Sequence, residues 1–547
     1  MKAVLKLMIL ALTLFVTINA VWAGGGNQSG SATRPVAYVR DPNLNPPGVF
    51  PINKQTVSLK VGLQQNAMVE NWKTNWMTRE FEKRGNFNLN FEVYPAGEMN
   101  QKIELMVMAG GADLPDVLFG SFNLATVTKY GQAGMVIPTN IYYENSAHFI
   151  NIAAKDLSID PKKYVTSWDG NIYGVYGINE SLNNQYSIGR VMIYEPWLRK
   201  LGLKMPETTD EFLNVLRAFR DRDPNGNGQK DEIPLMSFLD NMKTNYLYTL
   251  MMPFIYTQPN FWMLNNGRID VAFNKPGWRE GIRYSKQLVD EGLLSPLSFT
   301  QDNAAMTALI SPEPAKVGAV VRISSSNLGA NDKKRTEYWV VPPLEGPAGK
   351  NQLWWPTLPT IRMMITKNCK TPESAFMLGD FFATEEISVA LHYGEKGVDW
   401  IELPPGTKGY VDGYPALVRE VLLWGTLQNK HWAETGPQIR GKKWALPDFP
   451  TDSPFDFVVP IGRGLPAAIK YGTKQPITGL VYNDQEQALM NDLHSTIIDY
   501  VHESFARFVM GDLNIDRNWD SYVAEFDKMR LRDVITATQS AWDRMNR

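Results

Sequence analysis

The chain has 547 residues, enough for two or three domains, and its 55 basic and 57 acidic residues leave a formal net charge of −2. This balance argues against nucleic acid as a partner, because binding to phosphates needs a basic surface. The single cysteine, Cys369, excludes an internal disulfide, and we expect it to be a small buried hydrophobic side chain.

The first 23 residues have the pattern of a secretory signal peptide. Two lysines precede the mostly apolar residues 7–16, and Val21-Trp22-Ala23 is a cleavage site of the small-x-small type. A transmembrane anchor is the alternative, but the apolar stretch is short and interrupted by polar residues. No cysteine near Ala23 offers a site for lipid attachment. We therefore expect a free periplasmic protein with a flexible leader over residues 24–54.

Strand and helix patterns alternate in the part of the chain that follows. Strands are predicted at 57–63, 87–94 and 115–119, and helices at 68–84 and 99–109. This order predicts an α/β sheet with right-handed crossovers. Ligands bind such sheets outside the carboxyl ends of the strands. Ser121 and Asn123, which follow the third strand where a helix should begin, are therefore candidate ligand contacts.

The rest of the chain mixes strands with longer helices. Strands are predicted at 190–194, 316–322, 338–342 and 360–366, with a hairpin leading into a strand at 168–176. Helices are predicted at 196–201, through most of 240–310, and at 372–383, 485–509 and 523–545. A further helix is predicted after a capping box formed by Thr208 and Glu211. The stretch 390–450 is rich in loops, and a capped turn is predicted at 515–522. This order indicates two lobes between which the chain crosses more than once. We predict an N-terminal lobe of residues 55–178 plus 357–425, and a C-terminal lobe of residues 179–356 plus 426–547.

Residues 223–234 form a loop that is rich in side-chain oxygens. The candidate ligands of a metal are Asp223, Asn225, Asn227, Asp231 and Glu232, with the main-chain carbonyl of Gln229. Ca²⁺ prefers six to eight oxygens at roughly 2.3–2.6 Å on a flexible loop, and glycines let the backbone curl. The loop resembles an EF-hand in its first half, but its twelfth position is Pro234. A turn of Asx and Gly residues without metal is the alternative.

Sixteen tryptophans and 22 tyrosines give the chain many flat apolar faces with a polar edge, which suit the stacking of sugar rings. Trp354 and Trp355 precede the strand at 360–366, and Trp400 follows a glycine-containing loop. Tyr176 ends a strand at the first expected crossing between lobes. All four are candidate ligand contacts, and the alternative for each is a place in a hydrophobic core.

Arg322 ends a predicted strand of the second lobe and could bind a carboxylate-bearing sugar through two hydrogen bonds. An ordinary ion pair between strands is the alternative. The serines after it, in Ser324-Ser-Ser-Asn327, could cap a helix or donate to a ligand. Asn241 and Trp278 are weaker candidates.

Five segments carry a resemblance to a known family. They are Trp168-Asp-Gly-Asn-Ile-Tyr-Gly174, residues 201–212, the loop 223–234, Tyr393-Gly-Glu-Lys-Gly-Val-Asp-Trp400 and Ile515-Asp-Arg-Asn-Trp-Asp-Ser-Tyr522. Over roughly residues 55–545 the chain resembles the family 1 extracellular solute-binding proteins of sugar ABC importers. The nearest subgroup includes the calcium-binding alginate-oligosaccharide receptors. Many relatives carry a cysteine for lipid attachment, which this chain lacks.

The resemblance implies a two-lobed periplasmic binding protein fold of type II, with two sheets flanked by helices and joined by hinge crossings. It implies an oligosaccharide ligand held between the lobes, ABC permease transmembrane subunits as partners, a monomer that meets the membrane only through that complex, and a structural Ca²⁺ at the loop 223–234. The identity of the sugar does not carry over.

Three other functions remain open. A binding protein for a non-sugar solute such as a peptide would use the same fold. A secreted glycosidase needs two carboxylates at a defined separation, and Glu395 with Asp399 beside Trp400 are the nearest hint. A calcium-stabilised adhesion module would be rich in β-repeats, which this sequence lacks. No Gly-x-Ser-x-Gly elbow, zinc-type histidine pair or phosphate loop occurs, so we expect no enzyme.

Overall fold

The computed structural model describes residues 38–186, 190–238, 249–322, 333–451, 458–472 and 475–546. The predicted signal peptide, residues 24–37 of the predicted leader, Asn241 and the segment 324–327 lie outside these ranges. Within them, no helix combines the length and the apolar character that crossing a bilayer requires.

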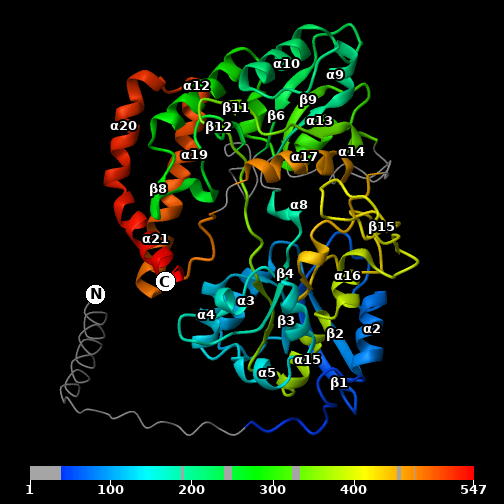
Figure 1. Ribbon diagram of the computed structural model, residues 1–547. Helices are drawn as coiled ribbons and strands as arrows, with labels where there is room; N and C mark the ends of the chain where they lie inside the picture. The colour runs from blue at the N-terminus through cyan, green and yellow to red at the C-terminus, as the bar shows by residue number, and fades with distance from the viewer. Residues whose placement is uncertain are drawn as a thin grey trace, which may run out of the picture. The chain divides into compact units, whose positions relative to one another are not determined.

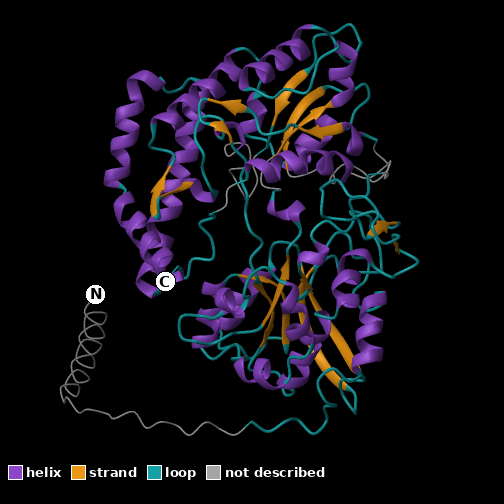
Figure 2. Ribbon diagram, viewed as in Figure 1, coloured by secondary structure: helices purple, strands orange, loops and turns teal. Residues whose placement is uncertain are grey.

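A six-stranded mixed sheet lies at the centre of what we call the first lobe. Its strands, in spatial order, are β16 (Ile439–Arg440), β4 (Val175–Asn179), β13 (Thr360–Ile365), β3 (Val117–Phe122), β1 (Val57–Gln64) and β2 (Phe87–Tyr94). β1 runs parallel to β2 and β3, whereas β13 runs antiparallel to β3 and β4. The helices of this lobe are α2 (Trp76–Gly85), α3 (Met99–Met108), α4 (Leu124–Gln132), α5 (Asn140–Asn145), α6 (Phe149–Ala153), α7 (Lys162–Val165), α15 (Pro372–Phe382) and α16 (Glu385–Tyr393). Figures 1 and 2 show α3 and α4 on one side of the sheet and α2 on the other.

A four-stranded sheet lies at the centre of the second lobe. Its order is β10 (Tyr338–Val340), β5 (Arg190–Tyr194), β9 (Val317–Arg322) and β6 (Ile233–Met236). β5 runs antiparallel to both of its neighbours, and β6 runs parallel to β9. The helices that follow these strands in the chain are α9 (Glu195–Leu201), α10 (Thr209–Asp221), α12 (Pro276–Asp290), α13 (Asn303–Ile310), α14 (Lys334–Glu337), α17 (Val458–Tyr471), α18 (Asp484–Leu489), α19 (Ser495–Met510), α20 (Ile515–Lys528) and α21 (Leu531–Met545).

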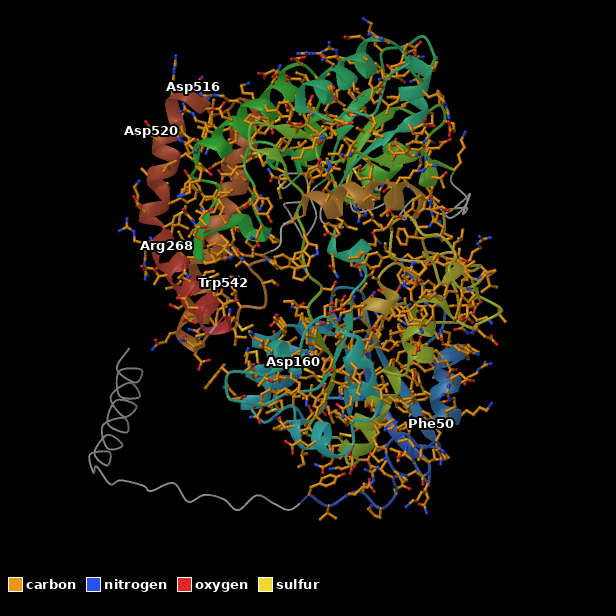
Figure 3. All side chains as sticks on the ribbon, in the orientation of Figure 1. Phe50, Asp160, Arg268, Asp516, Asp520 and Trp542 are labelled. Carbon is orange, nitrogen blue, oxygen red and sulfur yellow. The ribbon has the colours of Figure 1, made fainter. Side chains whose placement is uncertain are left out.

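Short elements complete the described chain. A four-residue helix, α8 (Leu182–Gln185), separates β4 from β5, and three hairpins are formed by β7 (Trp262–Asn265) with β8 (Arg268–Val271), β11 (Glu345–Gly346) with β12 (Gly349–Lys350), and β14 (Trp400–Glu402) with β15 (Val418–Glu420). Figure 3 shows Arg268 and Trp542 close together where β8 lies against α21.

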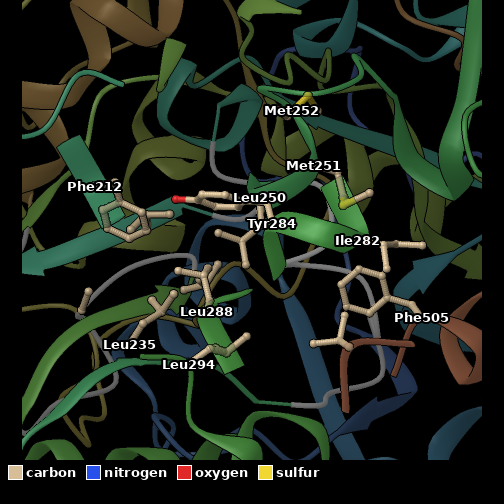
Figure 4. Packing of buried hydrophobic residues seen from close by; sticks show 14 of the residues in the cluster. Phe212, Leu235, Leu250, Met251, Met252, Ile282, Tyr284, Leu288, Leu294 and Phe505 are labelled. Atoms are coloured by element: carbon tan, nitrogen blue, oxygen red, sulfur yellow. The ribbon is translucent and has the colours of Figure 1, made fainter. Parts of the chain in front are cut away.

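Each lobe has a hydrophobic core of its own. The first core is built around β1, β3, β4 and β13 and includes the fully buried Trp432. The second core joins β5, β6 and β9 to the surrounding helices, and Figure 4 shows Phe212 of α10, Leu288 of α12 and Phe505 of α19 among its members. Apolar side chains at helical spacing explain the packing of α10, whose buried positions recur at Phe212, Leu216 and Phe219.

The chain passes from one sheet to the other three times in its described part. β4 of the first sheet is followed by β5 of the second, β10 of the second is followed after one hairpin by β13 of the first, and β16 of the first is followed by α17, which packs on β10. The predicted repeated crossing between lobes is thus present at the level of the sheets.

Most predicted strands and helices are confirmed, including the strands at β1, β2, β5, β9 and β13. The capped turn predicted at 515–522 is wrong, because these residues begin α20, where the side chain of Asn514 accepts hydrogen bonds from the N–H groups of Asp516 and Arg517. The helix predicted at 68–84 begins only at Trp76, and the β7–β8 hairpin interrupts the helical stretch predicted at 240–310. Thr208 caps α10 as predicted, but the Glu211 carboxylate accepts from the N–H of Glu207, so the predicted box is incomplete.

The limits of the two lobes stay a prediction. One observation bears on the limit placed at residue 425. β16 pairs with β4, and Trp432 is buried in the first core, although both were predicted to belong to the C-terminal lobe. These contacts favour a first lobe that extends at least to Arg440.

Candidate functional site

The oxygen-rich loop links the end of α10 to the start of β6. Gly226 and Gly228 have φ angles of 77° and 76°, which side chains other than glycine rarely adopt. Both oxygens of Asp223 accept hydrogen bonds from backbone N–H groups inside the loop: Oδ1 from Gly226 and Asn227, and Oδ2 from Gly228. Asp223 thereby folds the loop back on itself, as the sequence predicted for a turn of this composition.

Two further loop side chains and a lysine from outside the loop converge on one carboxylate. The amide nitrogens of Asn225 and Asn227 each donate to Oδ1 of Asp231 at 3.0 Å. The ammonium of Lys316 lies 2.7 Å from Oδ2 of the same residue. The hydrogen bond from Lys316 and those from the two asparagines lower the pKa of Asp231 to about 2. Asp231 is therefore ionised at neutral pH.

Glu232 carries a further carboxylate of the loop, and its oxygens lack hydrogen-bond donors of the kind that surround Asp231. Both of its oxygens are buried, and neither accepts a hydrogen bond of good geometry from any residue in the described ranges. Burial raises the pKa of Glu232 by more than the nearby backbone N–H groups lower it. A buried carboxylate without a partner is costly. Together with the neighbouring Asp and Asn oxygens, it forms a donor set that suits a hard divalent cation.

The loop therefore brings together the five side chains that were predicted to bind a metal. One short segment holds Asp223, Asn225, Asn227, Asp231 and Glu232. The amides of both asparagines donate to Asp231, and the charges of Asp223 and Asp231 act on Glu232. Gln229 donates its N–H to Oδ1 of Asn227 at 2.7 Å, and the predicted role of its carbonyl stays a prediction.

A separate cavity of about 420 Å³ lies beside α8. Its lining includes Glu180, Gln185, Tyr186, Trp354, Tyr414 and Lys442. The indole N–H of Trp354 donates to Oε1 of Gln185 at 2.8 Å, and the backbone N–H of Trp355 donates to the carbonyl oxygen of Gln185 at 2.9 Å. Aromatic faces and a few polar groups with fixed positions are typical of sites for small polar ligands.

Trp400 lies in a different cavity. It is 7% exposed, and its indole N–H donates to the carbonyl oxygen of Gly394 at 3.1 Å. The cavity, about 680 Å³, is lined by residues including Trp76, Trp400 and Trp444, and the described lining comes from the first-lobe segments and the β14–β15 region. The structure therefore does not bring Trp400 together with Trp354.

The two carboxylates considered for a glycosidase are used inside a loop. Oδ2 of Asp399 accepts from the N–H of Glu395 at 2.8 Å, and Glu395 forms an ion pair with Lys430 at 3.2 Å. Asp399 is 7% exposed. These contacts give both acidic side chains a structural explanation.

The remaining first-lobe candidates have structural contacts. Tyr176 is 1% exposed and stacks on Tyr143 with the ring centroids 5.9 Å apart, so its ring offers no free face to a sugar in this structure. Asn123 is exposed and caps α4 by accepting from the N–H of Thr126 at 2.8 Å. Ser121 is exposed near the carboxyl end of β3. Trp278 is fully buried in the second core.

Arg322 ends β9 and is 3% exposed. The residue directly opposite it on β5 is Arg190, which has the same charge. The ion pair that the sequence allowed as the alternative for Arg322 is therefore not formed across these strands.

A buried network of charges surrounds His392 of α16. Its Nδ1 lies 2.9 Å from Oε1 of Glu434, and its Nε2 lies 3.3 Å from Oε1 of Glu420. The imidazole also stacks on Trp424 at a centroid distance of 4.1 Å. One ligand atom from each of His392, Glu420 and Asp448 lies within 4.8 Å of the others, which is close enough for a metal.

The pKa of His392 indicates whether its imidazole carries a proton or is free to bind a metal. Burial alone lowers it, but the hydrogen bonds to Glu420 and Glu434 outweigh burial and raise it to about 9. A protonated imidazole cannot bind a metal. The ion-paired network is therefore favoured at neutral pH.

We expect the free energy of unfolding to fall as pH rises from about 6.5 to about 9, on the order of 1–3 kcal/mol. The raised pKa of His392 means that the folded state binds a proton which the unfolded state releases, so its stabilisation is complete below pH 6.5 and lost above 9. NMR titration of the histidine ring carbons measures this directly. The signal lost in His392→Gln should titrate near pH 9, and titration at or below 6.5 would contradict the network.

Sequence reasoning missed Gln185, Arg190 and His392. Gln185 meets Trp354 across 169 residues of sequence, and Glu434 lies 42 residues from His392. No local pattern marks such contacts. The alignment of Arg190 with Arg322 depends on strand register, which the sequence did not specify.

The chain resembles known proteins in both sequence and structure. A model of the family described as bacterial extracellular solute-binding protein matches residues 76–416. The fructooligosaccharide ABC transporter substrate-binding protein FusA of Streptococcus pneumoniae serotype 4 is 24% identical over 489 residues, which are 85% of this chain and 86% of FusA. A structure of S. pneumoniae FusA in complex with kestose has a TM-score of 0.74 and 22% identity, covering 89% of this chain and 99% of that chain.

A further solved structure is that of the alginate-binding protein AlgQ2 without calcium ion. It has a TM-score of 0.62 and 21% identity, covering 90% of this chain and 99% of that chain. An EF-hand mutant of FusA in complex with fructo-nystose has a TM-score of 0.70. These likenesses confirm the predicted fold, a type II solute-binding architecture with two sheets flanked by helices.

Proposed function

The chain belongs to the bacterial extracellular solute-binding protein family, and from that premise we propose that it is the component of an ABC importer that captures an oligosaccharide. The observation that carries this proposal is the cavity beside α8, where Trp354 and Gln185 are held together at 2.8 Å. The indole ring supplies an apolar face for a sugar ring, and the amide supplies a polar group of fixed position. FusA was solved with kestose and AlgQ2 is an alginate-binding protein, so both relatives bind carbohydrates, which supports the same class of ligand here.

Capture would depend on movement of the two lobes about the segments that join their sheets. Each lobe has its own core, so each can move as a rigid body while a few linking residues change conformation. We propose lobes with the predicted limits, except that the first lobe extends to at least Arg440. The pairing of β16 with β4 supports this change.

We propose Trp354 and Trp355 as ligand contacts, with Arg322 and Ser121 as further polar contacts. Trp354 lines the cavity and Trp355 is fixed to the same residue of α8. Trp400, Tyr176 and Asn123 are less suitable, because Trp400 lines another cavity, Tyr176 is buried on Tyr143, and the side chain of Asn123 caps a helix.

We also propose a structural Ca²⁺ at the loop 223–232. The buried carboxylate of Glu232 without a partner supports it, together with the nearby negative charges of Asp223 and Asp231. The names of the relatives, an EF-hand mutant of FusA and AlgQ2 without calcium ion, point to the same kind of site in those proteins. The ion would neutralise the charges of the three carboxylates and hold the end of α10 against the start of β6.

The further parts of the proposal concern place and partners. The signal-peptide pattern supports export to the periplasm, where the loaded protein would act as a monomer and dock on the transmembrane subunits of a permease. We propose no catalytic role, since the relatives are described as binding proteins and Glu395 and Asp399 are engaged in loop contacts.

Calorimetry of the purified mature protein with a panel of neutral and acidic oligosaccharides tests this function. We expect saturable binding at one site and a higher melting temperature with the ligand, with the sugar recovered unchanged. Release of new reducing ends would show a glycosidase instead. Saturable binding of peptides without any response to sugars would favour the non-sugar solute.

Trp354→Ala should weaken binding of the captured oligosaccharide about 10- to 100-fold, because truncation of a central aromatic contact typically costs one to several kcal/mol. Trp444→Ala is the matched control, since it removes the same side chain from the other cavity. Both affinities are measured by calorimetry. Weakening by Trp444→Ala without an effect of Trp354→Ala would move the ligand to the cavity that contains Trp400.

A further inference from the structure

Two arginines lie directly opposite each other in the second sheet. Arg190 is the first residue of β5, Arg322 is the last residue of β9, and the antiparallel register pairs them. Directly opposed residues place their side chains on the same face of a sheet, with Cβ atoms about 4.5–5.5 Å apart. The two residues are 6% and 3% exposed. The fold therefore buries two positive charges side by side.

The described partners of these guanidinium groups are neutral oxygens. Nη2 of Arg190 donates to the carbonyl oxygen and to Oδ1 of Asn183, both at 2.9 Å. Nη2 of Arg322 reaches Oδ1 of Asn303 at 3.5 Å, a long contact. Nη1 of Arg322 is buried and finds no hydrogen-bond partner in the described part of the chain. Burial lowers the pKa of Arg322 to about 10.

An uncompensated buried charge is among the most unfavourable arrangements in a folded protein. The adjacent positive charge of Arg190 increases this cost for Arg322, because like charges repel more strongly where water is absent. Such an arrangement persists where the missing negative charge comes from a ligand. Nη1 of Arg322 is the donor without an acceptor to which such a group would bind.

The position of the pair is also that of a binding site. Arg322 stands at the carboxyl end of β9, beside the carboxyl end of the parallel strand β6 (Figure 1), and ligands of α/β sheets bind at such ends. Arg190 is tied to Asn183 of α8, two residues before Gln185, which holds Trp354. One turn of α8 thus connects the paired arginines to the aromatic cavity.

We propose that Arg322, supported by the charge of Arg190, binds the oxyanion of an acidic oligosaccharide, either the carboxylate of a uronic acid or a sulfate ester. This inference rests on the proposed function and adds to it the charge of the ligand. The oxyanion accepts the hydrogen bond that Nη1 of Arg322 lacks, while another ring of the same sugar chain lies against Trp354. Neutral sugars leave the buried charge without a partner and bind more weakly.

The test compares sugars that differ in one charge. Binding of a short oligogalacturonate, its methyl ester and a sulfated galactan oligosaccharide of the same length is measured by calorimetry. We expect the wild-type protein to prefer at least one of the two acidic forms over the ester by about 10- to 100-fold, as for a hydrogen bond to a charged group. Preference for the carboxylate or for the sulfate identifies the source of the oxyanion.

Arg322→Gln should abolish this preference, so that the variant binds the acidic forms and the ester with equal affinity. Arg268→Gln is the control for overall charge, because it removes one exposed positive charge from the β7–β8 hairpin and should keep the preference. Arg322→Lys keeps the charge without the planar fork and should retain a weaker preference. Equal binding of acid and ester by the wild type, or an unchanged preference in Arg322→Gln, overturns the proposal while the capture function stands.

Thermal stability gives a second readout that a structural arginine would not produce. Without ligand, Arg322→Gln should melt at the same temperature as the wild type or higher, since it removes a buried charge without a counterion. A clear decrease would show a structural role and count against the proposal. Should no oligosaccharide bind at all, the capture function fails. Free galacturonate and sulfate then test the anion site alone, by a rise in melting temperature in the wild type that Arg322→Gln lacks.

Discussion

Trp432→Ala is expected to lower the free energy of unfolding of the first lobe by about 3–5 kcal/mol, the range for removal of a large buried aromatic side chain. Trp432 is fully buried, and its indole N–H donates to Oγ1 of Thr78 at 2.9 Å. Its ring makes edge contacts with Trp72, Phe81 and Phe119. Truncation would leave a large cavity between α2 and the sheet and would leave the Thr78 hydroxyl without this donor.

Urea unfolding followed by circular dichroism measures this loss, and the transition of each lobe must be resolved because a two-lobed protein need not unfold in one step. Trp168→Ala is the control, since Trp168 is 52% exposed and should change stability by less than about 0.5 kcal/mol. The variant also tests the lobe limits. Were residues 426–547 all part of the second lobe, Trp432→Ala would shift the transition of that lobe instead.

Removal of Ca²⁺ by a chelator is expected to lower the melting temperature of the second lobe by about 5–10 °C. An ion present at about 100 times its dissociation constant stabilises by about 2.7 kcal/mol, and each kcal/mol shifts the melting temperature of a domain of this size by about 2–4 °C. The physical reason is the buried carboxylate of Glu232, which no residue in the described ranges compensates. Added Ca²⁺ should restore the original value, as followed by differential scanning calorimetry.

Two variants make the calcium experiment specific. Glu232→Gln should melt at the same temperature as the chelated wild type or higher, but should respond less to Ca²⁺, because the amide removes both the buried charge and a ligand. Asp302→Asn lies outside the loop, where Asp302 caps α13, and should keep the full response. A wild-type protein that melts identically with chelator and with Ca²⁺ would disprove the metal site.

The longer elements could be predicted because their patterns are local. β1 and β2 follow a buried alternation, and α10 has a capping threonine and an apolar stripe. β16 could not be predicted in this way, since it has two residues and is defined only by its pairing with β4. The limit predicted at residue 425 depends on the same point, because Trp432 lies in a loop-rich segment whose sequence does not show which core it joins.

Some parts of the candidate site could likewise be predicted from the sequence, whereas others could not. The loop proposed as a metal site could be found in the sequence because all of its candidate oxygens lie within ten residues, and Arg322 could be found because it ends a strand. The partner of Trp354 could not be predicted, since the contact with Gln185 depends on the folded path of the chain. Whether the ring of Tyr176 joins a core or faces a ligand could not be predicted for the same reason. A tyrosine at a strand end has the same sequence pattern whether its ring faces solvent or stacks on Tyr143.

The late return of the chain to its first sheet sets the order of events during synthesis. β1 is made early, but Trp432 and β16, which complete its core, follow only after the whole second sheet has been made. At about 5–20 residues per second the ribosome needs roughly 20–70 s to make the stretch between Gln64 and Trp432. During that time the nascent first lobe exposes apolar surface and cannot reach its final packing. The first lobe is therefore completed only when most of the chain has been translated.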